Sequence, residues 1–222
     1  MTIDSRFPDS ILSRLYACGV VACLTIEDPT TSIPAARALL AGGIDVMELT
    51  LRTPTAMESF RRIKGEVPEM LAGVGTILTP EQVRVVVDAG GDFGVAPGLS
   101  ERVVLTAQDL GLPFAPGIAT PSELEKGLEL GCRELKFFPA EPMGGVSYLK
   151  SMRAPYAHLG VRFLPLGGLN VHNVEKYLQE PSVLAVGGSW IVTPELLRTG
   201  NWSAVTTAAR EVAAVVANCR TA

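Results

Sequence analysis

Residues 92–140, DFGVAPGLSERVVLTAQDLGLPFAPGIATPSELEKGLELGCRELKFFPA, contain three short apolar runs separated by two amphipathic stretches. Each amphipathic stretch opens on a residue type that caps helices, Ser100 or Thr120, and closes on a glycine, Gly111 or Gly131. Strands that alternate with helices in this way are typical of βα units built on a parallel sheet. The segment therefore predicts an α/β fold.

The same alternation continues over the rest of the chain, which has 222 residues. No nucleotide-binding glycine fingerprint accompanies it, which favours a closed (β/α)₈ TIM barrel over an open doubly wound sheet, the remaining alternative. We expect a single domain over residues 1–222, with an extra N-terminal helix at 8–18 and a further helix at 203–219. Eight runs are expected to form the strands: 20–26, 45–52, 70–77, 92–98, 112–119, 133–140, 161–168 and 183–189.

The composition excludes several classes of protein. Hydrophobic residues make up 47% of the chain and charged residues 19%, which excludes a disordered chain. A formal net charge of -4 argues against nucleic-acid binding, and the apolar runs are too short to span a membrane. The N-terminus lacks the pattern of a signal peptide, and the four cysteines have neither disulfide nor zinc spacing. We therefore expect reduced thiols in a cytoplasmic protein.

The second expected strand carries charged residues on one face. Strand alternation places Glu48, Thr50 and Arg52 together, and apolar residues on the opposite face. The apolar face suits packing against helices, so Glu48 and Arg52 should point into the barrel, where catalytic groups gather at the carboxyl ends of strands. A purely structural ion pair between Glu48 and Arg52 explains the same pattern equally well.

Lys136 lies in the sixth expected strand, between Leu135 and Phe137. Burial disfavours the charged form of a lysine, and a neutral amine can attack a carbonyl carbon and form a Schiff base. Pairing of Lys136 with Glu48 or Glu134, merely to fill the interior, is the structural alternative.

The last two expected strands end in paired glycines, Gly167-Gly168 and Gly187-Gly188-Ser189. The loops after strands seven and eight are the recurrent phosphate site of barrels, because glycine lets backbone N–H groups approach an anion and a following helix N-terminus adds a favourable dipole. Tight turns alone would also account for these glycines. Thr76 is a further polar group at a strand end; its alternative role is a helix cap, although Thr79 suits that role better.

Six segments together resemble the class I 2-keto-3-deoxy-6-phosphogluconate (KDPG) aldolases, a family that includes the 4-hydroxy-2-oxoglutarate (KHG) aldolases. The resemblance runs in order over nearly the whole chain, and the lysine segment is its most specific part. The segments are 48–54 (ELTLRTP), 73–76 (GVGT), 96–98 (APG), 136–141 (KFFPAE), 167–168 (GG) and 187–190 (GGSW).

The resemblance implies a role for each candidate residue. Lys136 would form the Schiff base with the keto carbon of pyruvate, and Glu48 would act as general acid/base through a bound water. Arg52 and Thr76 would hold the pyruvate carboxylate. The substrate would be a phosphorylated keto sugar acid, and the family is typically trimeric and needs neither cofactor nor metal. The other binding positions would be Pro97 and Phe138 in the apolar wall, and Gly167, Gly168, Gly188 and Ser189 around the phosphate.

The chain departs from the family pattern at Leu166, where a threonine usually precedes Gly167-Gly168. Leucine offers no hydrogen bond to a substrate, and apolar residues here occur in relatives that handle the galactonate epimer. The sugar acid is therefore open. KDPG is the first expectation, with 2-keto-3-deoxy-6-phosphogalactonate and 4-hydroxy-2-oxoglutarate as alternatives.

Two other classes of function also stay open. A phosphosugar isomerase or synthase on the same barrel would need the phosphate glycines and an acid/base pair but no imine. A non-catalytic phosphate-binding barrel would leave Glu48, Arg52 and Lys136 mutually neutralised. Metal-dependent aldolases need histidine ligands, and the chain has only His158 and His172, which we interpret as surface residues, so we expect no metal site.

Overall fold

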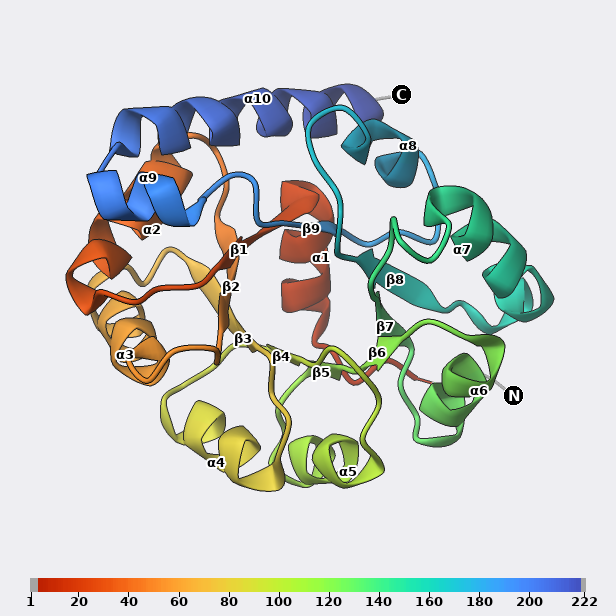
Figure 1. Ribbon diagram of the computed structural model, residues 1–222. Helices are drawn as coiled ribbons and strands as arrows, with labels where there is room; N and C mark the ends of the chain where they lie inside the picture. Colours follow the sequence, from red (N-terminus) through yellow and green to blue (C-terminus); the bar gives the residue numbers. More distant parts are fainter. Residues whose placement is uncertain (1–3, 221–222) are drawn as a thin grey trace.

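The computed structural model describes residues 4–220 and has an α/β fold in which parallel strands form curled sheets (Figure 1). Each of the eight expected runs contains a strand. The strands are β1 Val20–Leu24, β2 Val46–Thr50, β3 Leu71–Gly75, β4 Gly94–Val95, β5 Phe114–Ala115, β6 Gly117–Ile118, β7 Glu134–Phe137, β8 Arg162–Pro165 and β9 Val186–Gly188.

The strands belong to two sheets, which meet at Pro116. One sheet has the order β5-β4-β3-β2-β1-β9 and the other has the order β6-β7-β8. Proline has no N–H to donate to a ladder, and only Pro116 separates β5 from β6. Its carbonyl nevertheless accepts from the Lys136 N–H at 2.9 Å, so the two sheets are continuous along the chain at this point.

Helices follow the strands and cover the outside of the sheets (Figure 1). Thr79 and Thr120 each cap a helix through a reciprocal capping box, as their sequence context predicts, whereas the Ser100 side chain makes no cap bond. The helices are α1 Asp9–Cys18, α2 Ser32–Ala41, α3 Ala56–Glu66, α4 Pro80–Asp88, α5 Glu101–Asp109, α6 Pro121–Glu129, α7 Gly145–Arg153, α8 Val174–Leu178, α9 Pro194–Thr199 and α10 Trp202–Arg220, with short 3₁₀ turns at Pro29–Thr31 and Ala154–Leu159.

The two terminal helices lie where the sequence predicts them. Helix α10 packs on α2, where the Thr206 hydroxyl donates to the Ala38 carbonyl at 3.0 Å. Helix α1 crosses the middle of the view in Figure 1 and ends at Gly19, whose φ of 65° turns the chain into β1. Within residues 4–220, the helices fall short of the combined length and apolarity that a membrane span requires.

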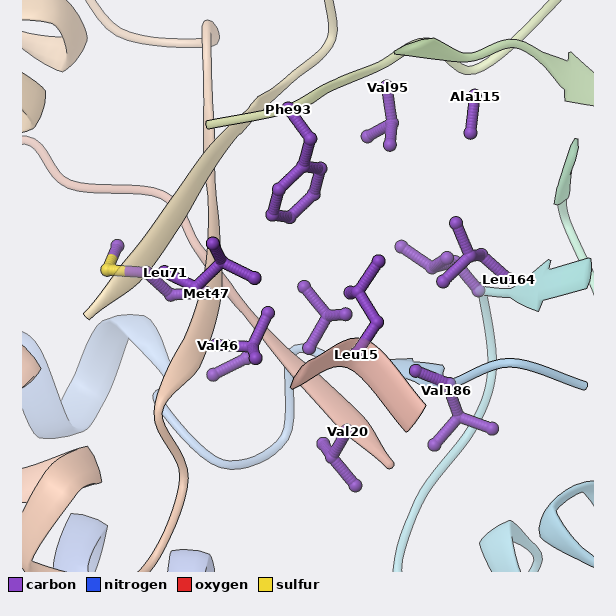
Figure 2. Packing of buried hydrophobic residues seen from close by; sticks show 14 of the residues in the cluster. Leu15, Val20, Val46, Met47, Leu71, Phe93, Val95, Ala115, Leu164 and Val186 are labelled. Atoms are coloured by element: carbon purple, nitrogen blue, oxygen red, sulfur yellow. The ribbon is translucent and has the colours of Figure 1, made fainter. Parts of the chain in front are cut away.

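The interior near α1 is filled by apolar side chains. Leu15 of α1 is fully buried, and Figure 2 shows it among side chains from several strands, including Val46, Leu164 and Val186. Removing such surfaces from water stabilises the fold by about 25 cal/mol per Å². Glu48 and Lys136 are among the few charged side chains that are buried in the described range, together with Glu134 and Glu180.

Candidate active site

Lys136 and Glu48 meet inside the fold, although they come from different sheets. Lys136 lies on β7 and Glu48 on β2, and Lys136 Nζ lies 3.3 Å from Glu48 Oε1. The two side chains are only 6% and 3% exposed. Glu134, the other expected partner of Lys136, instead bonds to Arg162 at 2.7 Å and to Ser5 at 2.9 Å. The site therefore contains one buried amine and one buried carboxylate in contact.

A glycine on β3 makes room for the Glu48 carboxylate. Gly75 pairs with Thr50 in the β2–β3 ladder, and the Glu48 side chain leans over it. A methyl group built on Gly75 would overlap Glu48 Oε1 and would lie 2.7 Å from Cγ, closer than real contacts allow. The side-chain position of Glu48 thus depends on the absence of a Cβ at residue 75.

Cys23 is a site residue that the sequence reasoning missed. It faces Glu48 across the β1–β2 ladder, and its Sγ lies 3.5 Å from Glu48 Oε2. Burial raises the pKa of the Cys23 thiol well above its ordinary value, the Glu48 charge adds to the rise, and Lys136 opposes it. The available signal was the alternation of β1, which places Cys23 and Thr25 on one face.

The strand pattern that predicted an inward-pointing Arg52 does not extend to this residue. Strand β2 ends at Thr50, and Arg52 lies in an exposed turn where its N–H bonds to the Thr50 carbonyl at 2.9 Å. Alternation therefore stops before it reaches residue 52. Among the residues that the structure describes, Arg52 forms no ion pair, so the expected alternative of an internal Glu48–Arg52 pair is wrong. The role of Arg52 toward a carboxylate stays a prediction.

Thr76 follows β3 directly and has an unusual backbone conformation. Its φ is 62°, and no other non-glycine residue in the described range has a positive φ. Such strain persists only where the surroundings hold it, and it clusters at functional sites. Thr79, rather than Thr76, caps α4 by accepting from the Gln82 N–H. The helix-cap explanation of Thr76 is therefore wrong.

Phe138 lies beside the amine, and Pro97 lies against the strand that pairs with Lys136. The Phe138 ring centroid is 5.5 Å from Lys136 Nζ. Gly117 pairs with Lys136 in the β6–β7 ladder, and a Cβ on Gly117 would lie 2.6 Å from the Gly98 nitrogen and overlap the Pro97 carbonyl. The role of Pro97 and Phe138 as an apolar wall stays a prediction.

Leu166 lies after β8 and is buried among the site residues. Its side chain covers Gly187 on β9, where a Cβ would come within 2.9 Å of Leu166 Cδ1. The next residue, Gly167, lies against Phe138, whose ring would be 3.2 Å from a Cβ at that position. Leu166 is therefore buried over β9, and its position near the substrate stays a prediction.

The glycine pairs lie at strand ends, but no helix begins directly after them. Gly168 is exposed after β8, and helix α8 starts only at Val174. Gly188 ends β9 and Ser189 is exposed after it, whereas α9 starts only at Pro194. The expected helix N-terminus beside each glycine pair is therefore wrong, because irregular segments intervene. Backbone N–H groups remain the available anion donors.

The described residues offer no ready metal ligand set. Within residues 4–220, no group of three or more His, Cys, Asp or Glu side chains is placed to hold a metal ion. His158 and His172, the only histidines, are both exposed.

A buried lysine in contact with a carboxylate, inside an α/β fold of parallel strands, provides the amine and the acid/base group that an imine-forming aldolase needs. Comparison with known proteins agrees with this class. A family model described as "KDPG and KHG aldolase" matches residues 11–208, and the chain belongs to this family of lyases.

Individual relatives share nearly their whole length with the chain. The 2-dehydro-3-deoxy-phosphogluconate aldolase of Dickeya dadantii is 44% identical over 90% of this chain and 93% of the relative. The KHG/KDPG aldolase of Escherichia coli K12 is 43% identical over 90% of this chain and 92% of the relative. A crystal structure of KDPG aldolase from Legionella pneumophila, with pyruvate captured as a covalent carbinolamine intermediate, has a TM-score of 0.87, 39% identity, and coverage of 90% of this chain and 97% of that one.

Proposed function

We propose that this aldolase cleaves 2-keto-3-deoxy-6-phosphogluconate to pyruvate and glyceraldehyde 3-phosphate through a Schiff base on Lys136. The observation that carries the proposal is the 3.3 Å contact between Lys136 Nζ and Glu48 Oε1, with both side chains nearly excluded from water. The relative from Dickeya dadantii is named for this substrate, and the Legionella pneumophila enzyme holds pyruvate covalently.

The first half of the reaction forms the imine. Lys136 Nζ attacks the C2 keto carbon as a neutral amine, and the carbinolamine that results loses water to give a protonated imine. Glu48 lies within reach of the nitrogen, so it can accept a proton from the attacking amine and supply one to the departing hydroxyl. The positive imine is then the electron sink next to the bond that breaks.

The second half of the reaction breaks the C3–C4 bond and protonates C3. Glu48 removes the proton from the C4 hydroxyl, directly or through a water, as the C3–C4 bond breaks and its electron pair flows into the enamine. The aldehyde leaves, and Glu48 returns the proton to C3 to give the imine of pyruvate. Water adds to C2, pyruvate departs, and the free amine is restored. One carboxylate therefore moves a proton from the C4 oxygen to C3.

The remaining residues would fix the two charged ends of the substrate. Arg52, in its exposed turn, and Thr76, at the strained end of β3, would hold the carboxylate, while Pro97 and Phe138 exclude water from the imine. Gly167, Gly168, Gly188 and Ser189 would bind the phosphate through backbone N–H groups and the serine hydroxyl. Clamping both ends aligns the C3–C4 bond with the imine, which is the condition for fast cleavage.

Borohydride trapping tests the proposal. The protein is incubated with pyruvate, reduced, digested and mapped by mass spectrometry. We expect the mass of a reduced pyruvyl group on Lys136, none on the exposed Lys150 or Lys176, and none anywhere in Lys136→Met. A wild-type protein that yields no trapped adduct on Lys136 would remove the imine and favour an imine-free isomerase or synthase type of site.

Leu166 favours a second candidate substrate. An apolar side chain over Gly187 offers no hydrogen bond to a C4 hydroxyl, so discrimination between the gluconate and galactonate epimers would be weak or reversed. A KHG aldolase activity would use the same imine without a phosphate. Values of kcat/KM on KDPG, its galactonate epimer and 4-hydroxy-2-oxoglutarate separate the three.

We also infer that the two sheets close into one eight-stranded (β/α)₈ barrel and that residues 1–222 form one domain. In support, β5 and β6 are halves of one segment around Pro116. At the other junction, Phe163 of β8 pairs with Val183, and the Leu184 N–H donates to the Phe163 carbonyl at 2.9 Å. Amide hydrogen exchange tests the closure, since protected amides are expected at residues 182–186 as in β1 and β2.

The same family points to a homotrimer. Large apolar side chains that stay exposed on or beside α4 and α5 support an association surface there: Leu78, Val85, Leu105 and Leu110. Light scattering should give about three times 23.5 kDa, and a monomer mass would contradict the proposal. The cytoplasmic location expected from the sequence stays a prediction.

A further inference from the structure

We propose that Cys23 is a positioning residue, whose S–H donates to Glu48 Oε2 and so keeps Oε1 turned toward the amine of Lys136. The inference rests on the proposed Schiff-base function. It adds to that function a third side chain, from β1, which touches the acid/base carboxylate but not the reacting atoms.

The two oxygens of Glu48 have different surroundings. Oε1 lies 3.3 Å from Lys136 Nζ and above Gly75, whereas Oε2 lies 3.5 Å from Cys23 Sγ. The terminal torsion of a glutamate is broad and roughly two-fold, so packing of the chain alone does not fix the plane of the carboxylate. A hydrogen bond donated to Oε2 favours the orientation of the Glu48 carboxylate in which Oε1 faces the amine of Lys136.

The thiol has a choice of acceptors, and the carboxylate is the better one. Cys23 Sγ also lies 3.5 Å from the Val21 carbonyl. At equal distance, a charged acceptor makes the stronger hydrogen bond. Desolvation and the Glu48 charge raise the pKa of Cys23, while Lys136 and the Gly188 N–H oppose the rise, so the thiol keeps its proton at neutral pH and can donate it.

The position of the thiol links it to the step that Glu48 performs alone. Deprotonation of C3 in the pyruvate imine, which gives the enamine, needs a correctly turned carboxylate. Formation of the imine depends first on the amine. Loss of the Cys23 donor should therefore slow proton transfer at C3 more than it reduces imine formation.

Exchange of the pyruvate methyl protons with D₂O, followed by NMR, measures this step without an aldehyde. We expect Cys23→Val, which keeps the volume and removes the donor, to slow exchange about tenfold, in line with a lost hydrogen bond to a charged group. Cys23→Ser, which keeps a donor, should stay within about threefold of wild type. Both variants should reach the wild-type yield of borohydride-trapped Lys136. Cys132→Val changes a buried thiol outside the site and serves as the control.

The outcomes separate this inference from the function on which it rests. Exchange at the wild-type rate in Cys23→Val, or equally slow exchange in Cys23→Ser, would overturn the positioning role. Absence of a trapped adduct in the wild type would overturn the proposed function itself. Should Cys23→Val not fold, Cys23→Ala removes the same donor without adding atoms and is read by the same two measurements.

Discussion

Substitution of Gly75 by alanine should separate placement of the acid/base group from formation of the imine. A Cβ at Gly75 would overlap Glu48 Oε1 and lie 2.7 Å from its Cγ, and contacts under 3.0 Å are essentially never found. The carboxylate must therefore move by about an ångström or more. A misplacement of about 1 Å at a reacting group can cost about 100-fold in rate, equivalent to ~2.7 kcal/mol in the barrier.

The assay compares steady-state KDPG cleavage with borohydride trapping of pyruvate. Gly75→Ala should lower kcat about 100-fold, and the trapped fraction of Lys136 should stay near that of the wild type because the amine is not displaced. Overpacking should also cost about 1–3 kcal/mol in the free energy of unfolding, measured by urea denaturation.

Gly73→Ala is the matched control, because it lies on the same strand but its Cβ would meet the Phe93 ring instead of Glu48. It should lose stability to a similar extent while retaining most of its kcat. Equal losses of kcat in the two variants would refute the reasoning, since a general weakening of β3 would then explain both.

Three further substitutions test other contacts. Leu166→Thr should restore a hydrogen-bond donor above Gly187 and change the gluconate-to-galactonate ratio of kcat/KM by about tenfold or more; an unchanged ratio would remove Leu166 from the specificity argument. Burial raises the pKa of Cys132 from 9.0 to about 12. Between these pH values the thiol stays protonated in the folded state and ionises in the unfolded state. The contribution of the Cys132 thiol to the free energy of unfolding therefore falls as the pH rises from 9 toward 12. For Cys132→Ala, urea denaturation should show that its difference from wild type in the free energy of unfolding is about 1 kcal/mol smaller at pH 10 than at pH 8. An equal difference at both pH values would contradict this. The Tyr177 hydroxyl donates to Glu141 Oε1 at 2.5 Å and is the main cause of the lowered pKa of the Glu141 carboxyl. The stabilisation of the fold by the ionised Glu141 is therefore present above about pH 4.5 and is lost as the pH falls through the lowered pKa. Tyr177→Phe should therefore cost about 1 kcal/mol at pH 7 and less at pH 3, and a loss that is equal at both pH values would mean that packing, not the bond, is responsible.

The strands and the central pair could be predicted from the sequence because burial imposes clear patterns. Each expected run contains a strand, and Lys136 and Glu48 are charged residues whose strand neighbours on both sides are apolar. Parallel strands bring such positions to one place even though they are 88 residues apart. Their contact follows from the fold rather than from any local motif.

Other parts of the site depend on where regular structure stops, which alternation does not reveal. Arg52 was placed on a strand face, but β2 ends at Thr50, so the argument no longer applied. The glycine pairs were expected to lead into helices, but α8 and α9 begin several residues later. Cys23 escaped prediction because the spacing of the four cysteines indicates only reduced thiols, although its strand face is readable from the sequence.

Helix α1 contributes to the packing of the interior and not to the candidate active site. Its Leu15 packs among apolar side chains of several strands, whereas catalytic groups of parallel barrels come from the carboxyl ends of the strands and the loops after them. The loops after β8 and β9 can therefore be redesigned to accept a new aldehyde. The apolar packing around Leu15 would keep the fold stable while those loops are varied.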